Sequence, residues 1–160
     1  FTETVNGESQ ASRGDFTASE DDNVLVTGVS GDKYALAYFG YAYYAENASK
    51  LKAIEIVNDQ GDCVAPEAAA INSGVYNPLS RPLFIYVRGD VAGVEPVKSF
   101  VEFYLSPTGR ELVGEAGYVA YPDEVYELAL GRLQNVNTEL LWGGASPKSG
   151  GVLERLKNNQ

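Results

Sequence analysis

Few side chains in this sequence have the types and spacing that catalysis or metal binding requires. Histidine is absent, and Cys63 is the single cysteine. The usual zinc sites, histidine-dependent acid/base catalysis and an intrachain disulfide are therefore excluded. Cys63 has acidic and apolar neighbours and no histidine to activate it, which favours a passive thiol over a nucleophile. We expect no metal, no cofactor and no catalytic residue.

A hydroxyl, three carboxylates and an amide follow one another in the segment Ser19-Glu20-Asp21-Asp22-Asn23. The spacing from Ser19 is that of a capping box, which predicts that a helix begins there. An apolar face follows at Leu25, Val26 and Val29, before Gly31 can end the helix. A plain helix cap explains all of these residue types.

Arg81 is the best single cation for an anion site, because a guanidinium binds phosphate or carboxylate bidentately. An arginine before a buried strand more commonly pairs with a neighbouring acid, so we leave Arg81 outside the ligand site. Three further short matches are an adhesion-type tripeptide, a glycosylation sequon and a serine near a lysine: Arg13-Gly14-Asp15, Asn47-Ala48-Ser49 and Ser146-Pro147-Lys148-Ser149. None has the surrounding groups that its chemistry needs, and we interpret all three as ordinary loop.

The composition restricts the partners of the chain. Its 160 residues include 12 Lys plus Arg against 22 Asp plus Glu, which gives a net charge of −10 and a pI near 4.4. Nucleic acids and anionic membranes attract clustered Lys and Arg, so neither is expected as a partner. An apolar content of 44% is enough for a cooperative core in one domain's worth of chain. The sequence contains neither a long apolar run nor the regions of a signal peptide.

Three apolar runs predict β-strands. Residues 34–39 and 83–87 are apolar at both odd and even positions, which is typical of strands buried on both faces. Residues 51–57 form another β-like run, which ends in the turn cluster at residues 58–62. Prolines ahead of residues 83–87 stiffen the approach to that strand.

Helices are predicted by caps and by the 3.6-residue period. Five apolar residues between 97 and 105 fall on one helical face behind Pro96, the clearest amphipathic pattern in the chain. Ser106 then acts as N-cap with Pro107 at the first helical position, and Gly117 ends that helix. Other patterns predict helices over residues 1–5, over 19–31, after residue 39, over 66–74, from residue 122 to 133, and over 152–156 behind a Gly/Ser/Pro-rich linker at 143–151. Strands that alternate with helices indicate an α/β fold.

Three consecutive segments carry a resemblance to a known family: ASEDDNVLVTGVSGDKYALAYFGYAYY, NPLSRPLFIYV and SFVEFYLSPTGRELVGEAGYVAYP. In this order they resemble the C-terminal half of the periplasmic phosphate-binding proteins that serve bacterial phosphate ABC importers, the PstS family, and in particular its cyanobacterial-type branch. The resemblance covers most of Ala18 to Leu156.

The resemblance implies part of a type II periplasmic-binding-protein fold, an α/β fold in which a mixed sheet flanked by helices forms each of two lobes around inorganic phosphate. Residues 1–52 then belong to the remainder of the second lobe, and residues 53–160 to the C-terminal part of the first. The family's main anion loop, an Arg followed closely by Ser-Gly-Thr, is not in this sequence. By the same likeness Ser19, Asp22 and Asn23 are peripheral ligand contacts at a helix start near the cleft. A carboxylate there accepts a hydrogen bond only from a protonated oxyanion.

The resemblance further implies a non-enzymatic protein that delivers phosphate to an ABC permease complex from the periplasm or another extracytoplasmic compartment. Two alternatives stay open, a related secreted phosphatase and an interaction module that reuses the fold. A fragment cut within a lobe exposes apolar surface, with Tyr41, Tyr43 and Tyr44 as candidates, and we expect it to associate with another copy.

Overall fold

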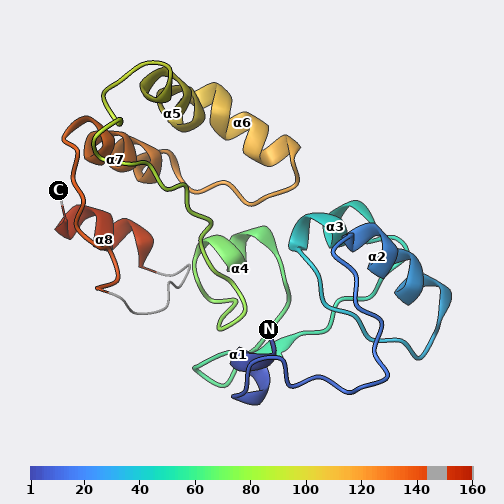
Figure 1. Ribbon diagram of the computed structural model, residues 1–160. Helices are drawn as coiled ribbons and strands as arrows, with labels where there is room; N and C mark the ends of the chain where they lie inside the picture. Colours follow the sequence, from blue (N-terminus) through green and yellow to red (C-terminus); the bar gives the residue numbers. More distant parts are fainter. Residues whose placement is uncertain (144–150, 160) are drawn as a thin grey trace.

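The computed structural model describes residues 1–143 and 151–159 and contains short helices joined by long connections (Figure 1). The predicted linker and its Ser146 and Lys148 thus lie mainly outside the described residues. The helices are α1 Thr2–Asn6, α2 Asp22–Gly31, α3 Tyr41–Glu46, α4 Ala68–Asn72, α5 Val97–Leu105, α6 Pro107–Glu115, α7 Asp123–Gln134 and α8 Val152–Asn158. The strands are β1 Ile56–Val57 and β2 Cys63–Val64. Within these ranges, no helix is both long and apolar enough to cross a membrane.

The boundary between α5 and α6 forms as its sequence predicts. The Ser106 hydroxyl accepts a hydrogen bond from the backbone N–H of Gly109 at 3.2 Å, and Pro107 occupies the first turn of α6. Gly109 is buried, and a Cβ at this position would clash with the backbone carbonyl oxygens of Phe103 and Tyr104. The sharp bend between the two helices therefore depends on a capping serine and on a residue without a side chain.

The apolar face predicted for α5, which consists of Val97, Phe100, Val101, Tyr104 and Leu105, is confirmed only in part. Val101 is buried at the centre of the helix, but Phe100 and Tyr104 are exposed. α5 packs against α6 and α7, and these two helices cover a stripe narrower than the full apolar arc of α5. A helix buries only the part of its apolar face that a neighbour covers.

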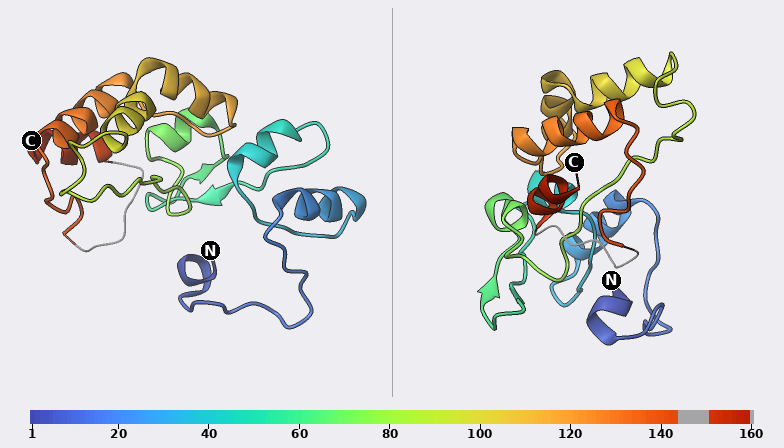
Figure 2. Two further views of the ribbon diagram at one scale, coloured as in Figure 1. Left: turned by 45° about the horizontal axis from the view of Figure 1, so that its top comes forward. Right: turned by 90° about the vertical axis from the view of Figure 1, so that its left-hand side faces the viewer.

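The main apolar cluster lies where α7 meets α8. Val125, Val152 and Leu156 are buried there, and five partly buried residues surround them: Tyr121, Leu128, Leu141, Trp142 and Leu153. Hydrogen bonds to the backbone fasten the same region. Arg132 donates to the carbonyl oxygens of Glu139 and Asn159, both at 2.6 Å. Figure 2 shows α5 to α8 grouped together, away from α2 and α3, with α4 and the two strands between the groups.

The turn predicted at residues 58–62 is confirmed as the turn of an antiparallel hairpin. Ile56 pairs with Val64, and Val57 pairs with Cys63. Asn58 is buried, and its Oδ1 accepts hydrogen bonds from the backbone N–H groups of Gln60 and Asp62. The β-like run at 51–57 is paired only over its last two residues, because the partner strand is itself two residues long.

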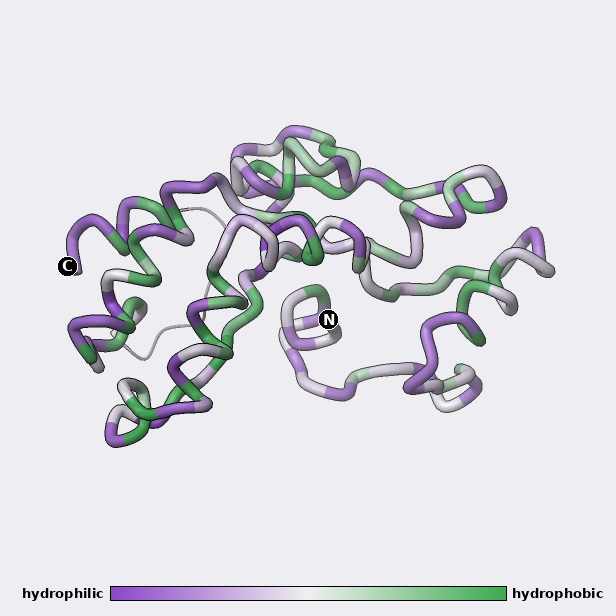
Figure 3. Tube along the Cα trace, turned by 90° about the horizontal axis from the view of Figure 1, so that it is seen from above, coloured by the Kyte–Doolittle hydropathy of each residue, from purple (hydrophilic) through white to green (hydrophobic). Residues whose placement is uncertain are grey.

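Two of the three predicted strands are wrong for the described part of the chain. Residues 34–39 and 83–87 lie in no sheet, and the one sheet found in the described ranges is the β1–β2 hairpin. Tyr34, Leu36 and Tyr86 are exposed. Figure 3 shows hydrophobic residues along the extended connections as well as on the helices. A strand apolar on both faces is buried only between neighbouring strands and covering layers, and here neither residue range has a strand partner.

One close contact joins the two groups of helices. Gly117, in the connection after α6, has φ +79°, and a Cβ built on it would lie 2.7 Å from the Cβ of Ala42 in α3. Ala42 is buried by this approach. The contact links the segment predicted to belong to one lobe, residues 1–52, with the segment predicted to belong to the other, residues 53–160. That division into lobes stays a prediction.

Candidate functional site

The structure brings the predicted ligand residues Ser19, Asp22 and Asn23 together at the start of α2, but with a different cap. Asp21 is the N-cap, and its Oδ1 accepts hydrogen bonds from the backbone N–H of Asn23 at 2.9 Å and from the Asn23 side-chain amide at 3.2 Å. The prediction that the helix begins at Ser19 is therefore wrong by two residues. Aspartate caps a helix as well as serine does, and its carboxylate reaches the N–H two residues ahead.

Ser19 instead folds back onto the backbone of Asp21. Its hydroxyl oxygen lies 3.0 Å from the Asp21 nitrogen, from which it accepts, and 3.1 Å from the Asp21 carbonyl oxygen, to which it donates. Ser19 and Asp22 are partly buried, whereas Asp21 and Asn23 are exposed. The sequence prediction of the apolar face behind them is confirmed, because Val26 is buried and Leu25 and Val29 are partly buried.

The start of α2 therefore presents more acceptors than free donors. The backbone N–H of Asn23 and one N–H of its side-chain amide are bound to Asp21, and Asp22 adds a second carboxylate in the first turn. These carboxylates stabilise the positive end of the helix dipole. Towards an oxyanion they repel the fully ionised form and accept a hydrogen bond from a protonated oxygen. The arrangement suits a peripheral contact that responds to the protonation of the ligand.

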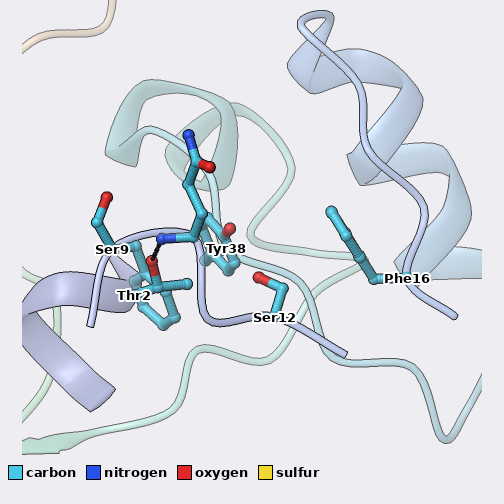
Figure 4. A pocket seen from close by; sticks show the side chains of 7 residues that line it. Thr2, Ser9, Ser12, Phe16 and Tyr38 are labelled. Carbon is cyan, nitrogen blue, oxygen red and sulfur yellow. Dashed lines mark hydrogen bonds between the residues drawn. The ribbon is translucent and has the colours of Figure 1, made fainter. Parts of the chain in front are cut away.

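A surface hollow that the sequence analysis missed lies between α1, the following loop and Tyr38 (Figure 4). Its volume is about 500 Å³, and it is lined by Phe1, Thr2, Ser9, Gln10, Ser12, Phe16 and Tyr38. The Thr2 hydroxyl accepts a hydrogen bond from the backbone N–H of Gln10 at 2.8 Å, and the Phe1 and Tyr38 rings stack with centroids 3.9 Å apart. The adjacency of Tyr38 is a long-range contact that no local pattern predicts.

The hollow offers hydroxyls and aromatic walls but no charged side chain. No Lys or Arg is among its lining residues. Strong binding of an oxyanion uses charge-assisted hydrogen bonds or several convergent N–H donors. The Thr2 oxygen, which faces the loop, already accepts from Gln10. This hollow therefore lacks the groups of a main phosphate site.

The arginines of the described chain are mostly engaged elsewhere. Arg13 makes a bidentate contact with Asp15 at 2.8 and 2.7 Å, which lowers the pKa of that carboxyl. Arg88 holds Asp90 in the same way at 3.1 and 2.6 Å, so the tripeptide singled out at residues 13–15 occurs a second time. Arg81 is exposed and makes no ion pair within the described ranges. Its exclusion from the ligand site stays a prediction.

Arg110 is the most enclosed arginine of an ion pair and serves the packing of α6 on α7. Its Nη1 lies 2.9 Å from Asp123 Oδ1, within ion-pair distance but outside hydrogen-bond geometry. Its guanidinium lies over the Tyr126 ring, 5.3 Å from the centroid. Burial raises the pKa of Tyr126. These groups form a structural contact between two helices, far along the chain from α2.

Metal-binding clusters are not found among residues 1–143 and 151–159. No three or more Asp, Glu or Cys side chains in these ranges are grouped to hold an ion. Cys63 is an exposed free thiol in β2.

The fold defines the class of protein. The structure matches the crystal structure of a possible phosphate binding protein from Planctomyces limnophilus with a TM-score of 0.70 and 48% identity, over 84% of this chain and 48% of that one. The chain therefore has an α/β fold that is part of the type II periplasmic-binding-protein fold, as the sequence predicts. No protein-family model matches the sequence.

Sequence relatives place the chain within a family. It is 43% identical to Protein SphX of Synechococcus elongatus over 148 residues, 92% of this chain and 44% of the relative. It is 40% identical to Protein SphX of a Synechocystis strain over 98% of this chain and 46% of the relative. It is 38% identical to Phosphate-binding protein PstS of Staphylococcus haemolyticus over 67% of this chain and 34% of the relative. This chain belongs to the family of PstS and SphX, and it spans about half the length, or less, of these relatives.

Proposed function

We propose that this chain is part of a protein that binds inorganic phosphate outside the cytoplasm and delivers it to an ABC permease. The observation that carries the proposal is its 38% identity, over 108 residues, to a protein named for phosphate binding. The solved structure that it matches is likewise described as a possible phosphate binding protein. The protein works by binding and release and forms no covalent bond with its ligand.

The mechanism that we propose is closure of two lobes around the anion. Residues 1–52 and 53–160 contribute to different lobes, and helix starts directed at the cleft donate N–H groups to phosphate. Ser19, Asp22 and Asn23 act at the edge of that site. The hydrogen bonds that Asn23 already donates to Asp21, one from its backbone N–H and one from its side-chain amide, support a peripheral role for this helix start. Asp22 accepts a hydrogen bond from a protonated phosphate oxygen and so favours the protonated ligand.

The main contacts, in this proposal, belong to the family's Arg and Ser-Gly-Thr loop, which these 160 residues do not contain. Two observations support that division. The start of α2 carries carboxylates beside donors that are already bonded. The hollow beside α1 has no lysine or arginine in its lining. We therefore expect these 160 residues alone to bind phosphate weakly or not at all.

Isothermal titration with inorganic phosphate near neutral pH, with sulfate as control, tests the proposal. A protein of family length that contains this sequence is expected to bind phosphate selectively, and the 160 residues alone to give no heat. Absence of phosphate binding by the family-length protein would refute the function. Tight, selective binding by the 160 residues would refute the location of the main contacts. Turnover of a chromogenic phosphate ester by the family-length protein would refute the non-enzymatic mechanism.

The edge contacts are tested in the same family-length protein. Asp22→Asn removes the carboxylate that accepts from the protonated ligand, and Asp32→Asn, at the other end of α2, is the matched control. We expect Asp22→Asn to flatten the pH dependence of phosphate affinity near neutral pH and Asp32→Asn to leave it unchanged. Identical pH profiles for the two variants would place Asp22 outside the site.

A further inference from the structure

Asn6 and Gly7 form the single Asn-Gly pair of the sequence, and they lie on the surface at the end of α1. Asn6 is the last residue of the helix, and Gly7 follows it with φ +77°. Both residues are exposed. A Cβ built on Gly7 would have no atom within 4 Å, so no other part of the described chain packs on this position. Solvent therefore reaches the pair.

An asparagine followed by glycine reacts with its own backbone. The backbone nitrogen of Gly7, once it has lost its proton, attacks Cγ of Asn6 and closes a five-membered succinimide ring. The bond from Cγ to the side-chain nitrogen breaks, and this nitrogen takes up a proton from solvent and leaves as ammonia. Water then opens the ring at one of its two carbonyl carbons, which leaves aspartate or isoaspartate. Glycine favours the attack because it has no Cβ to obstruct the close approach of its nitrogen.

Two hydrogen bonds oppose this reaction in the folded helix. Nδ2 of Asn6 donates to the carbonyl oxygen of Ala11 at 2.8 Å, and the backbone N–H of Gly7 donates to the carbonyl oxygen of Glu3 at 3.0 Å. While α1 is intact, the attacking nitrogen keeps its proton and the amide of Asn6 is held away from it. The reaction therefore requires the last turn of α1 to open.

The last turn of α1 opens at little cost. The helix has five residues, none of them buried, and its N-cap residue Phe1 makes no side-chain cap hydrogen bond. A helix this short is marginal in water unless tertiary packing supports it. The stack of the Phe1 ring on Tyr38 supports the opposite end of the helix. Fraying ends of this kind open with a free energy near zero.

We propose that Asn6 is a site of spontaneous deamidation in the folded protein. The chain supplies a closely matched comparison in Asn72, which is also the last residue of a five-residue helix, α4. The N–H of Ser73 donates back into that helix at 3.0 Å, as the N–H of Gly7 does in α1. Ser73 has the Cβ that Gly7 lacks, and Asn72 is partly buried. We expect Asn6 to deamidate and Asn72 to persist, whether or not the protein binds phosphate.

Deamidation of Asn6 loosens the loop beside the hollow at α1. The bond from Asn6 to Ala11 fastens this loop to the helix, together with the bond from the Gln10 N–H to the Thr2 hydroxyl (Figure 4). An aspartate at position 6 has no N–H to donate, so its carboxylate and the Ala11 carbonyl oxygen repel each other as two acceptors. Gln10 lines the hollow. We therefore expect the reaction to release one wall of the hollow.

Peptide mapping by mass spectrometry tests the proposal. A protein of family length that contains this sequence is incubated at about pH 8, folded or in urea, and isoaspartate is labelled with isoaspartyl methyltransferase. The Asn6 peptide of the folded protein is expected to convert within about tenfold of its rate in urea, because the end of α1 opens at little cost. The rate rises with pH, because the attacking nitrogen must lose its proton. The Asn72 peptide serves as the internal control.

Two substitutions separate the chemistry from the fraying of the helix. Gly7→Ala places a Cβ at φ +77°, which weakens the end of α1 but obstructs ring closure, so we expect deamidation to slow by about tenfold or more. Asn6→Asp, one product of the reaction, should speed amide exchange at Gln10 and Ser12, whose N–H groups are hydrogen-bonded in the loop. Asn72→Asp makes the same change of charge at the end of α4 and should leave that exchange unchanged.

Two results would overturn the proposed site. They are an Asn6 that stays intact in the folded protein while it deamidates in urea, and a Gly7→Ala variant that deamidates as fast as the unchanged protein. Equal amide exchange at Gln10 and Ser12 in Asn6→Asp and in the unchanged protein would refute the loosening of the loop.

Discussion

Replacement of Leu156 by alanine is expected to weaken this fold more than any comparable deletion on its surface. Leu156 is 3% exposed and lies in the α7–α8 cluster with Val125 and Val152. Buried Leu→Ala substitutions cost about 2–5 kcal/mol, the sum of lost transfer free energy and of the cavity left behind. The cluster is small and its rim is only partly buried, so its residues can close part of that cavity. We therefore expect a loss of about 2–3 kcal/mol, near the lower end of that range.

Thermal unfolding monitored by Trp142 fluorescence measures the effect, because Trp142 packs on the same cluster. In a chain of this size a loss of about 2–3 kcal/mol lowers the melting temperature by roughly 4–12 °C. Leu140→Ala removes the same atoms from a side chain that is 75% exposed, and it is the matched control. Equal melting temperatures for the two variants would refute the assignment of the α7–α8 cluster as the core.

Three further predictions concern single contacts. Gly117→Ala should lower the free energy of unfolding by about 1–3 kcal/mol, because φ is +79° at this position and the new Cβ would clash with Ala42. The control is Gly114→Ala, whose Cβ has no atom within 4 Å and which should be neutral or stabilising. Equal denaturant midpoints for the two variants would contradict this prediction. Ser106→Ala removes the N-cap of α6 and should lower the free energy of unfolding by about 1 kcal/mol, measured by chemical denaturation. An unchanged denaturation midpoint would show that the cap does not contribute to stability. Burial raises the pKa of Tyr126 above its ordinary value of 10.0, so the folded state binds the phenol proton more tightly than the unfolded state, and the free energy of unfolding falls as the pH rises from about 10. Melting curves between pH 8 and 11 should show a smaller loss of stability at high pH in Tyr126→Phe than in the unchanged protein. An identical loss in both would show that Tyr126 does not cause it.

Local interactions explain why the helices could be predicted. The pairing of Ser106 with Pro107, the period of residues 97–105 and the glycines at the ends of helices act over three or four residues, which the sequence displays directly. Even the missed cap at Asp21 is a local error, since serine and aspartate compete for the same N–H groups. The identity of the capping residue depends on backbone angles that the sequence does not display.

The candidate site was predicted less completely than the helices. Ser19, Asp22 and Asn23 do lie together, because they are neighbours in the chain. That Asn23 donates both its backbone N–H and one amide N–H to Asp21 emerges only from the side-chain geometry. The hollow beside α1 joins residues 1–16 to Tyr38, and its stacked rings come from positions that no short motif connects.

The sequence by itself determined which regions are helical, the acidic charge of the chain, the absence of histidine chemistry and the family to which the chain belongs. These properties depend on residue types and on interactions between near neighbours. Only the tertiary structure decided which apolar runs are covered. Residues 83–87 have the composition of a central strand, yet they are exposed, because a strand is buried by other strands and layers and not by its own residues. The close approach of Gly117 to Ala42 is likewise a product of how distant segments pack.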